Sequence, residues 1–194
     1  MSEKSAQKRI YILETARKVF IKKGFKSVTM KDIVEACEIS RGGLYLYFSS
    51  TEEIFMEVLK METEETDDVF SGSIGKNATP SDILALFLKE QKKELLGRKD
   101  NLTMAVYEFF FVNKFPKKNH FLKQQFEAAV KIIEKLIEAG VEAGEFYCED
   151  PLGAARNIMY VLEGLKIASQ TRGIAEEVVD REVLYIMRGL VIEE

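Results

Sequence analysis

The stretch VTMKDIVEACEISRGGLYLYF, residues 28–48, decides the fold of this chain. It holds two helix-start signals close together, so it predicts two short helices joined by a sharp turn. Thr29 suits the N-cap of the first helix, with Asp32 completing a capping box, and Ser40 suits the N-cap of the second. Two such helices are typical of a helix-turn-helix, whose second helix lies in the major groove of DNA. The stretch therefore predicts DNA binding.

Helices are predicted on both sides of this stretch. Upstream, apolar residues at spacings of three and four predict a helix over residues 6–23. Downstream, Ser50 and Glu53 form a further capping box, which predicts a helix over 51–68. Residues 1–50 are therefore expected to form a three-helix helix-turn-helix DNA-binding domain.

The rest of the chain also has helical periodicity. Further helices are predicted over residues 81–97, 101–114, 119–143, 151–172 and 176–191. Residues 71–80 are rich in Gly, Ser, Asn and Pro and predict a loop. No segment alternates convincingly at a period of two, so no sheet is expected. The predicted fold is all-α with about nine helices: the N-terminal domain and a larger C-terminal helical bundle, residues 51–194.

Two glycines inside the short second helix of the motif need a reason. Gly42 and Gly43 each cost about 1 kcal/mol relative to alanine in a helix interior. The functional interpretation is a close approach of the backbone to a phosphate or a base edge. The alternative interpretation is a loose first turn.

The charge distribution fits a protein that meets DNA at one end. Residues 1–50 hold ten Lys and Arg against five Asp and Glu, a net charge of +5. The formal charge of the chain is −4, so the remaining residues carry −9. A basic segment on an acidic body supports the helix-turn-helix prediction.

Residue types that enzymes and metal sites need are scarce. The two cysteines, Cys37 and Cys148, have no C-x-x-C spacing, which argues against a disulfide framework and for a reducing cytoplasm. His120 is the only histidine, so a zinc cluster or a histidine-based triad is not expected. The sequence has no phosphate loop, no nucleophile elbow and no apolar run long enough to span a membrane. We expect a cytoplasmic protein that is not an enzyme and has no cofactor, metal or membrane partner.

Residues 29–54 resemble the DNA-binding signature of the TetR (tetracycline-repressor-like) family of transcriptional regulators. The shared pattern is a Thr at a helix start, Ile-x-x-Ala, an aliphatic-Ser-x-Gly turn, Leu-Tyr-x-Tyr-Phe and Glu-Glu-aliphatic. In this chain these residues are Thr29, Ile33, Ala36, Ile39, Ser40, Arg41, Gly42, Leu44, Tyr45, Tyr47, Phe48, Glu52, Glu53 and Ile54. The resemblance implies a two-domain, all-helical homodimer that binds a double-stranded DNA operator and usually responds to a small effector. It implies that residues 51–194 form the domain for effector binding and dimerisation.

The resemblance also implies roles for individual residues. Those implied to contact phosphates, which set the register, are Thr29, Ser40 and Tyr47. Those implied to lie nearer the bases, which set the sequence preference, are Arg41, Gly42 and Tyr45, with Gly43 beside them.

Three positions depart from the family pattern. Glu38 stands where a turn glycine is often found, Gly43 replaces a usual polar residue, and Thr51 replaces a lysine that commonly opens the fourth helix. These departures bear on the affinity and on the operator sequence more than on DNA binding itself.

An aromatic-rich segment, residues 104–112, is a candidate effector site, which the family resemblance favours. It is apolar around most of a helix, which indicates burial on several sides. Ordinary hydrophobic core is one interpretation, and the wall of an apolar ligand pocket within a helical bundle is the other. The residues predicted to line the pocket are Met104, Tyr107, Glu108, Phe111, Phe126, Met159 and Glu163.

Two apolar stripes near the end of the sequence predict the dimer interface. A single domain can bury both stripes internally, whereas the family resemblance implies that they pair with a second copy. The predicted interface residues are Leu152, Ala155, Met159, Leu162, Val183, Ile186, Met187 and Leu190. A dimer presents two recognition helices to half-sites one helical turn of DNA apart, or a multiple of it, which implies a palindromic operator.

These observations predict a ligand-responsive repressor that a small apolar effector releases from its operator. One rival is an activator or another DNA binder without an effector, for which the aromatic segment is filled core. A second rival is a carrier of apolar molecules or an enzyme, which would lack salt-sensitive DNA binding.

Overall fold

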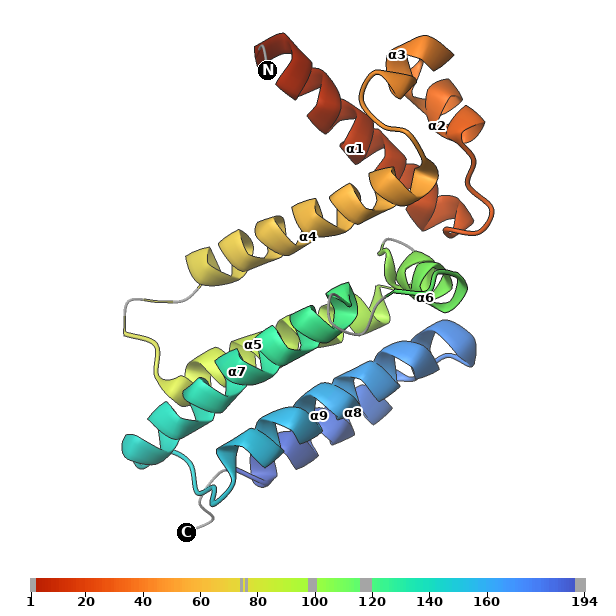
Figure 1. Ribbon diagram of the computed structural model, residues 1–194. Helices are drawn as coiled ribbons and strands as arrows, with labels where there is room; N and C mark the ends of the chain where they lie inside the picture. The colour runs from red at the N-terminus through yellow and green to blue at the C-terminus, as the bar shows by residue number, and fades with distance from the viewer. Residues whose placement is uncertain (1–2, 74, 76, 98–100, 116–119, 191–194) are drawn as a thin grey trace. The chain divides into compact units, whose positions relative to one another are not determined.

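The computed structural model describes residues 3–73, 75, 77–97, 101–115 and 120–190. Within these residues the chain forms nine helices and no β-strand (Figure 1). The helices are α1 (Glu3–Lys23), α2 (Met30–Cys37), α3 (Arg41–Tyr45), α4 (Thr51–Ser73), α5 (Pro80–Leu96), α6 (Thr103–Val112), α7 (Phe121–Glu142), α8 (Pro151–Thr171) and α9 (Glu176–Arg188). The predicted all-α fold is confirmed, and α1, α2 and α3 are the three helices of the helix-turn-helix.

The chain divides into two compact units, and the division differs from the one predicted at residue 50. The N-terminal unit joins Met1–Gly72 with Lys99–Lys114, so it contains α4 and α6 as well as the first three helices. The C-terminal unit joins Ser73–Arg98 with Phe115–Glu194 and contains α5, α7, α8 and α9. The N-terminal unit is thus larger than expected and is not continuous in sequence.

Four phenylalanines from different segments form the centre of the N-terminal unit. The ring of Phe55 on α4 lies 4.8 Å from that of Phe20 on α1, between centroids, and 4.9 Å from that of Phe109 on α6. The ring centroid of Phe25, in the loop after α1, lies 4.7 Å from that of Phe109. All four side chains are buried, and edge-on or tilted pairs such as these stabilise a core beyond the area that they bury. Helix α6 is therefore part of the hydrophobic core beneath the helix-turn-helix.

Ion pairs add polar links between α1 and α4. The guanidinium of Arg9 pairs with Glu57, and that of Arg17 pairs with Glu62 through two nitrogens. Hydrogen bonds from Lys60 and then Arg9 lower the pKa of Glu57 below its ordinary value. From residue 64 onward, the side chains of α4 lie outside the described residues.

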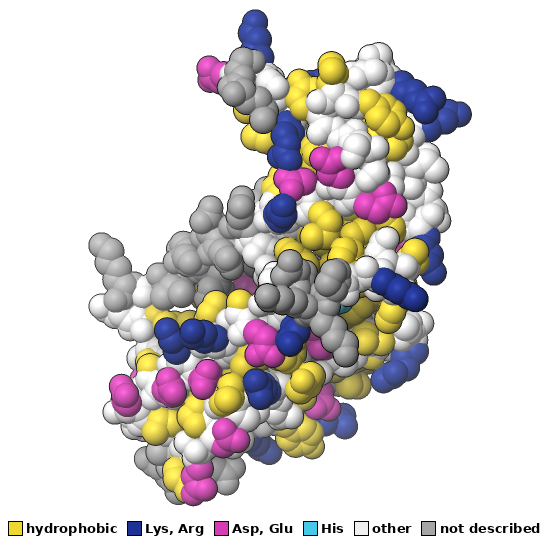
Figure 2. Space-filling view, in the orientation of Figure 1, with side chains coloured by type: hydrophobic (Ala, Val, Ile, Leu, Met, Phe, Trp, Pro, Cys, Tyr) yellow, Lys and Arg dark blue, Asp and Glu magenta, His cyan; other side chains and the backbone are white. Residues whose placement is uncertain are grey.

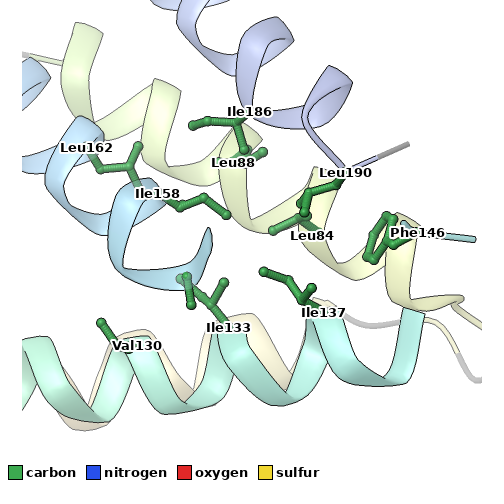
Figure 3. Packing of buried hydrophobic residues seen from close by; sticks show 11 residues of the cluster. Leu84, Leu88, Val130, Ile133, Ile137, Phe146, Ile158, Leu162, Ile186 and Leu190 are labelled. Atoms are coloured by element: carbon green, nitrogen blue, oxygen red, sulfur yellow. The ribbon is translucent and has the colours of Figure 1, made fainter. Parts of the chain in front are cut away.

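Facing helices in the C-terminal unit bury a continuous aliphatic core (Figure 3). The buried side chains are Leu84, Leu88, Val130, Ile133, Ile137, Phe146, Ala155, Ile158, Leu162, Ile186 and Leu190. Gly140 on α7 is required by this packing, because a Cβ there would lie 2.1 Å from Cδ2 of Phe146. The phenyl ring therefore occupies the space that any larger residue would need.

Two polar contacts tie α5 to its neighbours. The buried hydroxyl of Ser169 on α8 donates to the carbonyl of Leu95 at 2.7 Å. At the surface, the ammonium of Lys92 pairs with Glu176 at 2.7 Å and with Asp180 at 2.5 Å, both on α9.

None of the helices in the described residues has both the length and the apolar character of a membrane span.

Candidate DNA-binding interface

A complete capping box fixes the start of α2. The Thr29 hydroxyl accepts from the backbone N–H of Asp32 at 3.3 Å, and the Asp32 carboxylate accepts from the backbone N–H of Thr29 at 2.8 Å. The hydroxyl of Thr29 also donates to that carboxylate at 2.7 Å. This confirms the predicted capping box and sets the position of Thr29, an exposed residue at the helix N-terminus.

A cation from α1 adds to this cap. The ammonium of Lys23 lies 2.6 Å from Oδ1 of Asp32. This hydrogen bond, followed by those from Thr29, holds the pKa of Asp32 well below its ordinary value of 3.8. The sequence analysis did not identify this contact. The contact joins residues nine positions apart, and the basic residue at the end of α1 was its one sequence signal.

The turn between α2 and α3 has the left-handed backbone that glycine usually supplies. Glu38 has φ 52° and ψ 40°, and it is the one non-glycine residue with positive φ in the described parts of the chain. Its N–H donates to the carbonyl of Glu35 at 3.3 Å. The departure from the family pattern at this position therefore leaves the turn geometry intact, at a cost in backbone strain.

Helix α3 begins with a lighter cap. The Ser40 hydroxyl accepts from the backbone N–H of Gly43 at 3.0 Å, which confirms Ser40 as the N-cap. A Cβ at Gly43 would lie 3.1 Å from that same oxygen, a tight contact. The glycine thus gives the capping hydroxyl room, which is a reason within the protein itself.

Gly42 differs from Gly43 in this respect. A Cβ built at Gly42 meets no described atom within 4 Å, and the residue is exposed. Packing within the protein therefore does not explain a glycine in the first turn of α3. The sequence analysis did not distinguish the two glycines, but their surroundings in the structure differ.

The exposed side of α3 carries a mixed polar and apolar surface. The guanidinium carbon of Arg41 lies 5.5 Å from the ring centroid of Tyr45, a cation–π arrangement. Tyr45 is exposed, Tyr47 is half-buried, and Leu44 and Phe48 are buried as core. Between the two tyrosines, the side chain of Leu46 is 84% exposed. Sequence reasoning did not select Leu46, although a leucine between two predicted contact residues was a signal.

Helix α4 begins at Thr51 as predicted, but one half of its capping box involves Ser49 in place of Ser50. The Ser50 hydroxyl accepts from the N–H of Glu53 at 3.2 Å, as expected. However, the Glu53 carboxylate accepts from the backbone N–H of Ser49 at 2.7 Å and from its hydroxyl at 2.6 Å. These bonds lower the pKa of Glu53 below its ordinary value. At the third departure from the family pattern, the Thr51 hydroxyl bonds to Glu52 at 3.3 Å.

The residues predicted to line one effector pocket fall in two different units. Met104, Tyr107, Glu108 and Phe111 belong to the N-terminal unit, whereas Phe126, Met159 and Glu163 belong to the C-terminal unit. Phe126 and Met159 pack against the aliphatic core, and Glu163 lies on the exposed side of α8. Desolvation raises the pKa of Glu163 above its ordinary value.

Within the aromatic segment, burial is uneven. Ala105 and Phe109 are buried in the core of the N-terminal unit, as the core interpretation predicts, whereas the side chain of Phe111 is 81% exposed. Glu108 bonds to a backbone N–H of the N-terminal unit. Its predicted role as a polar group of the pocket therefore receives no support from its contacts.

Most residues predicted for the dimer interface lie inside their own unit. Ala155, Leu162, Ile186 and Leu190 are buried in the aliphatic core; Met159, Val183 and Met187 pack partly buried against it; Leu152 is 37% exposed. The first four are corrected from interface to core. The apolar spacing detected the inward side of each helix. Periodicity shows which residues share a face, but not whether that face packs against the same unit or a second copy.

The outward sides of α8 and α9 carry a different apolar set. Tyr160, Ile167, Leu184 and Tyr185 are exposed there, and hydrophobic side chains lie between charged ones on the surface of this unit (Figure 2). Gly164, also exposed on α8, has no described atom within 4 Å of a Cβ position.

Comparisons with known proteins agree with this architecture. The family model described as bacterial regulatory proteins, tetR family, matches residues 12–58, and that of tetracyclin repressor-like C-terminal domains matches residues 83–179. The uncharacterized HTH-type transcriptional regulator YfiR of Bacillus subtilis is 32% identical over 77% of this chain and 73% of its own. The HTH-type transcriptional regulator QacR of Staphylococcus aureus is 24% identical, over 86% and 88%.

Solved structures share the fold. A transcriptional regulator from Saccharomonospora viridis, determined in complex with choline, aligns with a TM-score of 0.84 over 97% of this chain and 100% of that one, at 21% identity. A TetR-family regulator from Agrobacterium tumefaciens aligns with a TM-score of 0.78 over 96% and 99%, at 14% identity. Together with the two family models, these matches establish that the chain belongs to the TetR family of bacterial transcriptional regulators, DNA-binding proteins that act as dimers and are not enzymes.

Proposed function

We propose that this chain is a homodimeric transcriptional repressor that leaves a palindromic operator when a small effector binds. The observation that supports DNA binding is the exposed first turn of α3, in which Gly42 has no side chain. Gly42 has open space where a side chain would be, and Arg41 and Tyr45 lie exposed beside it. A backbone without side chains at this point lets DNA approach closely, while Arg41 and Tyr45 supply contacts to base edges.

The capped helix starts support contacts to phosphates. Thr29 and Ser40 each lie at a helix N-terminus, where free backbone N–H groups and the helix dipole favour an anion. Tyr47, half-buried after α3, has a phenol that suits the same role. Action on bacterial DNA would place the protein in the cytoplasm, as the sequence predicted.

The test is a mobility shift with DNA from upstream of its own gene and the neighbouring genes, at two salt concentrations. Arg41→Ala and Tyr47→Ala should each weaken specific binding, by roughly tenfold or more for a base-reading arginine. Arg172→Ala, which removes an exposed arginine from the C-terminal unit, is the matched control and should bind normally. Failure of the wild-type protein to bind any of these DNAs, or equal binding by all variants, would refute the proposal.

For the dimer, we propose that the outward faces of α8 and α9 meet a second copy. Exposed Tyr160 and Ile167 supply the apolar surface, and Gly164 between them permits a close helix approach. Ile167→Glu should shift the protein from dimer to monomer in analytical ultracentrifugation, because it places a charge in that interface. Ile132→Glu on α7, where the isoleucine is 63% exposed, is the control and should leave the dimer intact.

Release by an effector is proposed from family membership, since ligand-responsive repressors are typical of it. The choline complex of the S. viridis protein supports the idea that this fold accommodates a small ligand. The rival without an effector is favoured by Ala105 and Phe109, which are filled core. A panel of small apolar compounds and organic cations added to the protein–operator complex distinguishes the two. An effector must release DNA, and DNA must weaken effector binding by the same factor.

A further inference from the structure

Glu108 makes a specific contact with the loop that precedes α2. It lies on α6, yet its Oε2 accepts from the backbone N–H of Lys26 at 2.9 Å. Gly24, the first residue after α1, has φ +73°, and a Cβ there would lie 2.6 Å from the same oxygen. Gly24 therefore provides both the left-handed backbone and the space that the carboxylate occupies.

The residue next to Glu108 holds the same loop by an apolar contact. The ring of Phe109 lies 4.7 Å from that of Phe25, between centroids, and both are buried. Two consecutive residues of α6 thus contact two consecutive residues of the loop: Phe109 contacts the side chain of Phe25, and Glu108 accepts from the backbone of Lys26. A loop fixed by both kinds of contact has little freedom to shift along α6.

This loop leads directly to the proposed phosphate contact at Thr29. Val28, immediately before Thr29, is buried and its N–H donates to the carbonyl of Phe25 at 3.2 Å. At the other end, Lys23 is tied to Asp32 in the first turn of α2. The start of α2 therefore follows the position of Phe25 and Lys26, which α6 holds.

Helix stability alone does not explain an acidic residue at this place. The carboxylate lies beside the C-terminus of α1, where the helix dipole favours cations and disfavours anions. The helix dipole therefore does not account for a glutamate here, whereas the hydrogen bond from Lys26 N–H does.

We propose that Glu108 is a positioning residue for DNA binding: it anchors the α1–α2 loop to α6 and so sets the place of Thr29 and α2. This inference deepens the proposed function and rests on it. It makes operator affinity depend on a residue 50 positions beyond the N-terminal family match, which ends at residue 58.

Three variants test the inference. Glu108→Ala removes the acceptor, Glu108→Gln keeps an oxygen acceptor but removes the charge, and Glu138→Ala removes an exposed glutamate from α7 as the control. Operator affinity is measured beside amide hydrogen exchange of residues 24–29, with the melting temperature as a check on folding. Glu108→Ala should lower the affinity about tenfold and speed exchange at the Lys26 amide, because Lys26 N–H then loses its acceptor on α6. Glu108→Gln and Glu138→Ala should stay within about twofold of wild type, because both leave an acceptor for Lys26 N–H.

Each alternative outcome has a definite reading. Faster exchange in Glu108→Ala with unchanged affinity overturns the positioning role, and so does an equal loss of affinity in Glu108→Gln. If wild-type protein binds no operator, the proposed function fails. The exchange measurement then still shows whether Glu108 anchors the loop.

Discussion

The two helices of the DNA-binding motif are held in different ways. Helix α2 begins at a capping box that a cation from α1 extends, so Thr29, Asp32 and Lys23 share several hydrogen bonds. Helix α3 is only five residues long and begins at one hydrogen bond from Gly43 to Ser40. Helix α2 is thus held by its own polar contacts. Helix α3 depends on the buried Leu44, and its first turn has an exposed glycine, Gly42.

The largest expected effect separates the two glycines of α3. Gly42→Ala should weaken operator binding by tenfold or more while raising the free energy of unfolding by up to about 1 kcal/mol, because alanine favours the helix and meets open space in the free protein. Mobility shifts and denaturant unfolding measure the two quantities. Gly43→Ala is the control: its tight contact with Ser40 should remove the gain in stability. Operator binding by Gly42→Ala at wild-type strength would indicate that the bare turn has no partner.

The next effect compares the two caps. Thr29→Ala should lower the free energy of unfolding by about 1–2 kcal/mol, and Ser40→Ala by about 0.5–1 kcal/mol, since loss of a cap commonly has this size. The first is larger because Thr29 also anchors the Asp32 carboxylate. Urea unfolding of both variants provides the measurement. A greater loss in Ser40→Ala would reverse the comparison between the helices.

Acid should act on one cap and not on the other. The pKa of Asp32 is lowered in the folded protein, so its charge adds stability above the ordinary pKa of 3.8, and this stability is lost as the pH falls below that value. Wild type should therefore be more stable than Asp32→Asn at pH 6, and the difference should shrink toward pH 3. Ser40 has no titrating group, so the difference between wild type and Ser40→Ala should stay constant. Unfolding curves across this pH range would decide it; a constant Asp32→Asn difference would contradict the assignment.

The smallest effect concerns the turn between the helices. Glu38→Gly should raise the free energy of unfolding by about 0.5 kcal/mol, because glycine adopts a positive φ without strain but loses more backbone entropy. Thermal unfolding detects a gain of this size as a rise of a few degrees or less. A decrease would mean that the Glu38 side chain stabilises the turn in a way that outweighs its backbone strain.

Local signals explain why this part of the molecule was predictable. The cap at Thr29, the cap at Ser40 and the end of the first helix at residue 23 each depend on residues within one turn, and all three are confirmed. The capping box at Ser50 was only half right, because Ser49 offered the Glu53 carboxylate two donors instead of one.

Long-range contacts explain what sequence reasoning missed. The bond between Glu108 and Lys26 joins residues 82 positions apart, and no local pattern records it. The stripes of α8 and α9 were correctly detected as apolar, but Leu162 and Ile186 pack inside the unit. Both helices also expose apolar residues on their other sides, so a periodic pattern alone could not separate core from interface.

The discontinuity of the N-terminal unit has a consequence for how the protein is made. Its core needs Phe109 of α6, which the ribosome adds only after the whole of α5. At bacterial rates of roughly 5–20 residues per second, the intervening segment takes several seconds to synthesise. During that time the nascent helix-turn-helix lacks one wall of its core. DNA binding should therefore begin only after more than half of the chain, through Phe109, has been translated, and chains that terminate earlier should not occupy the operator.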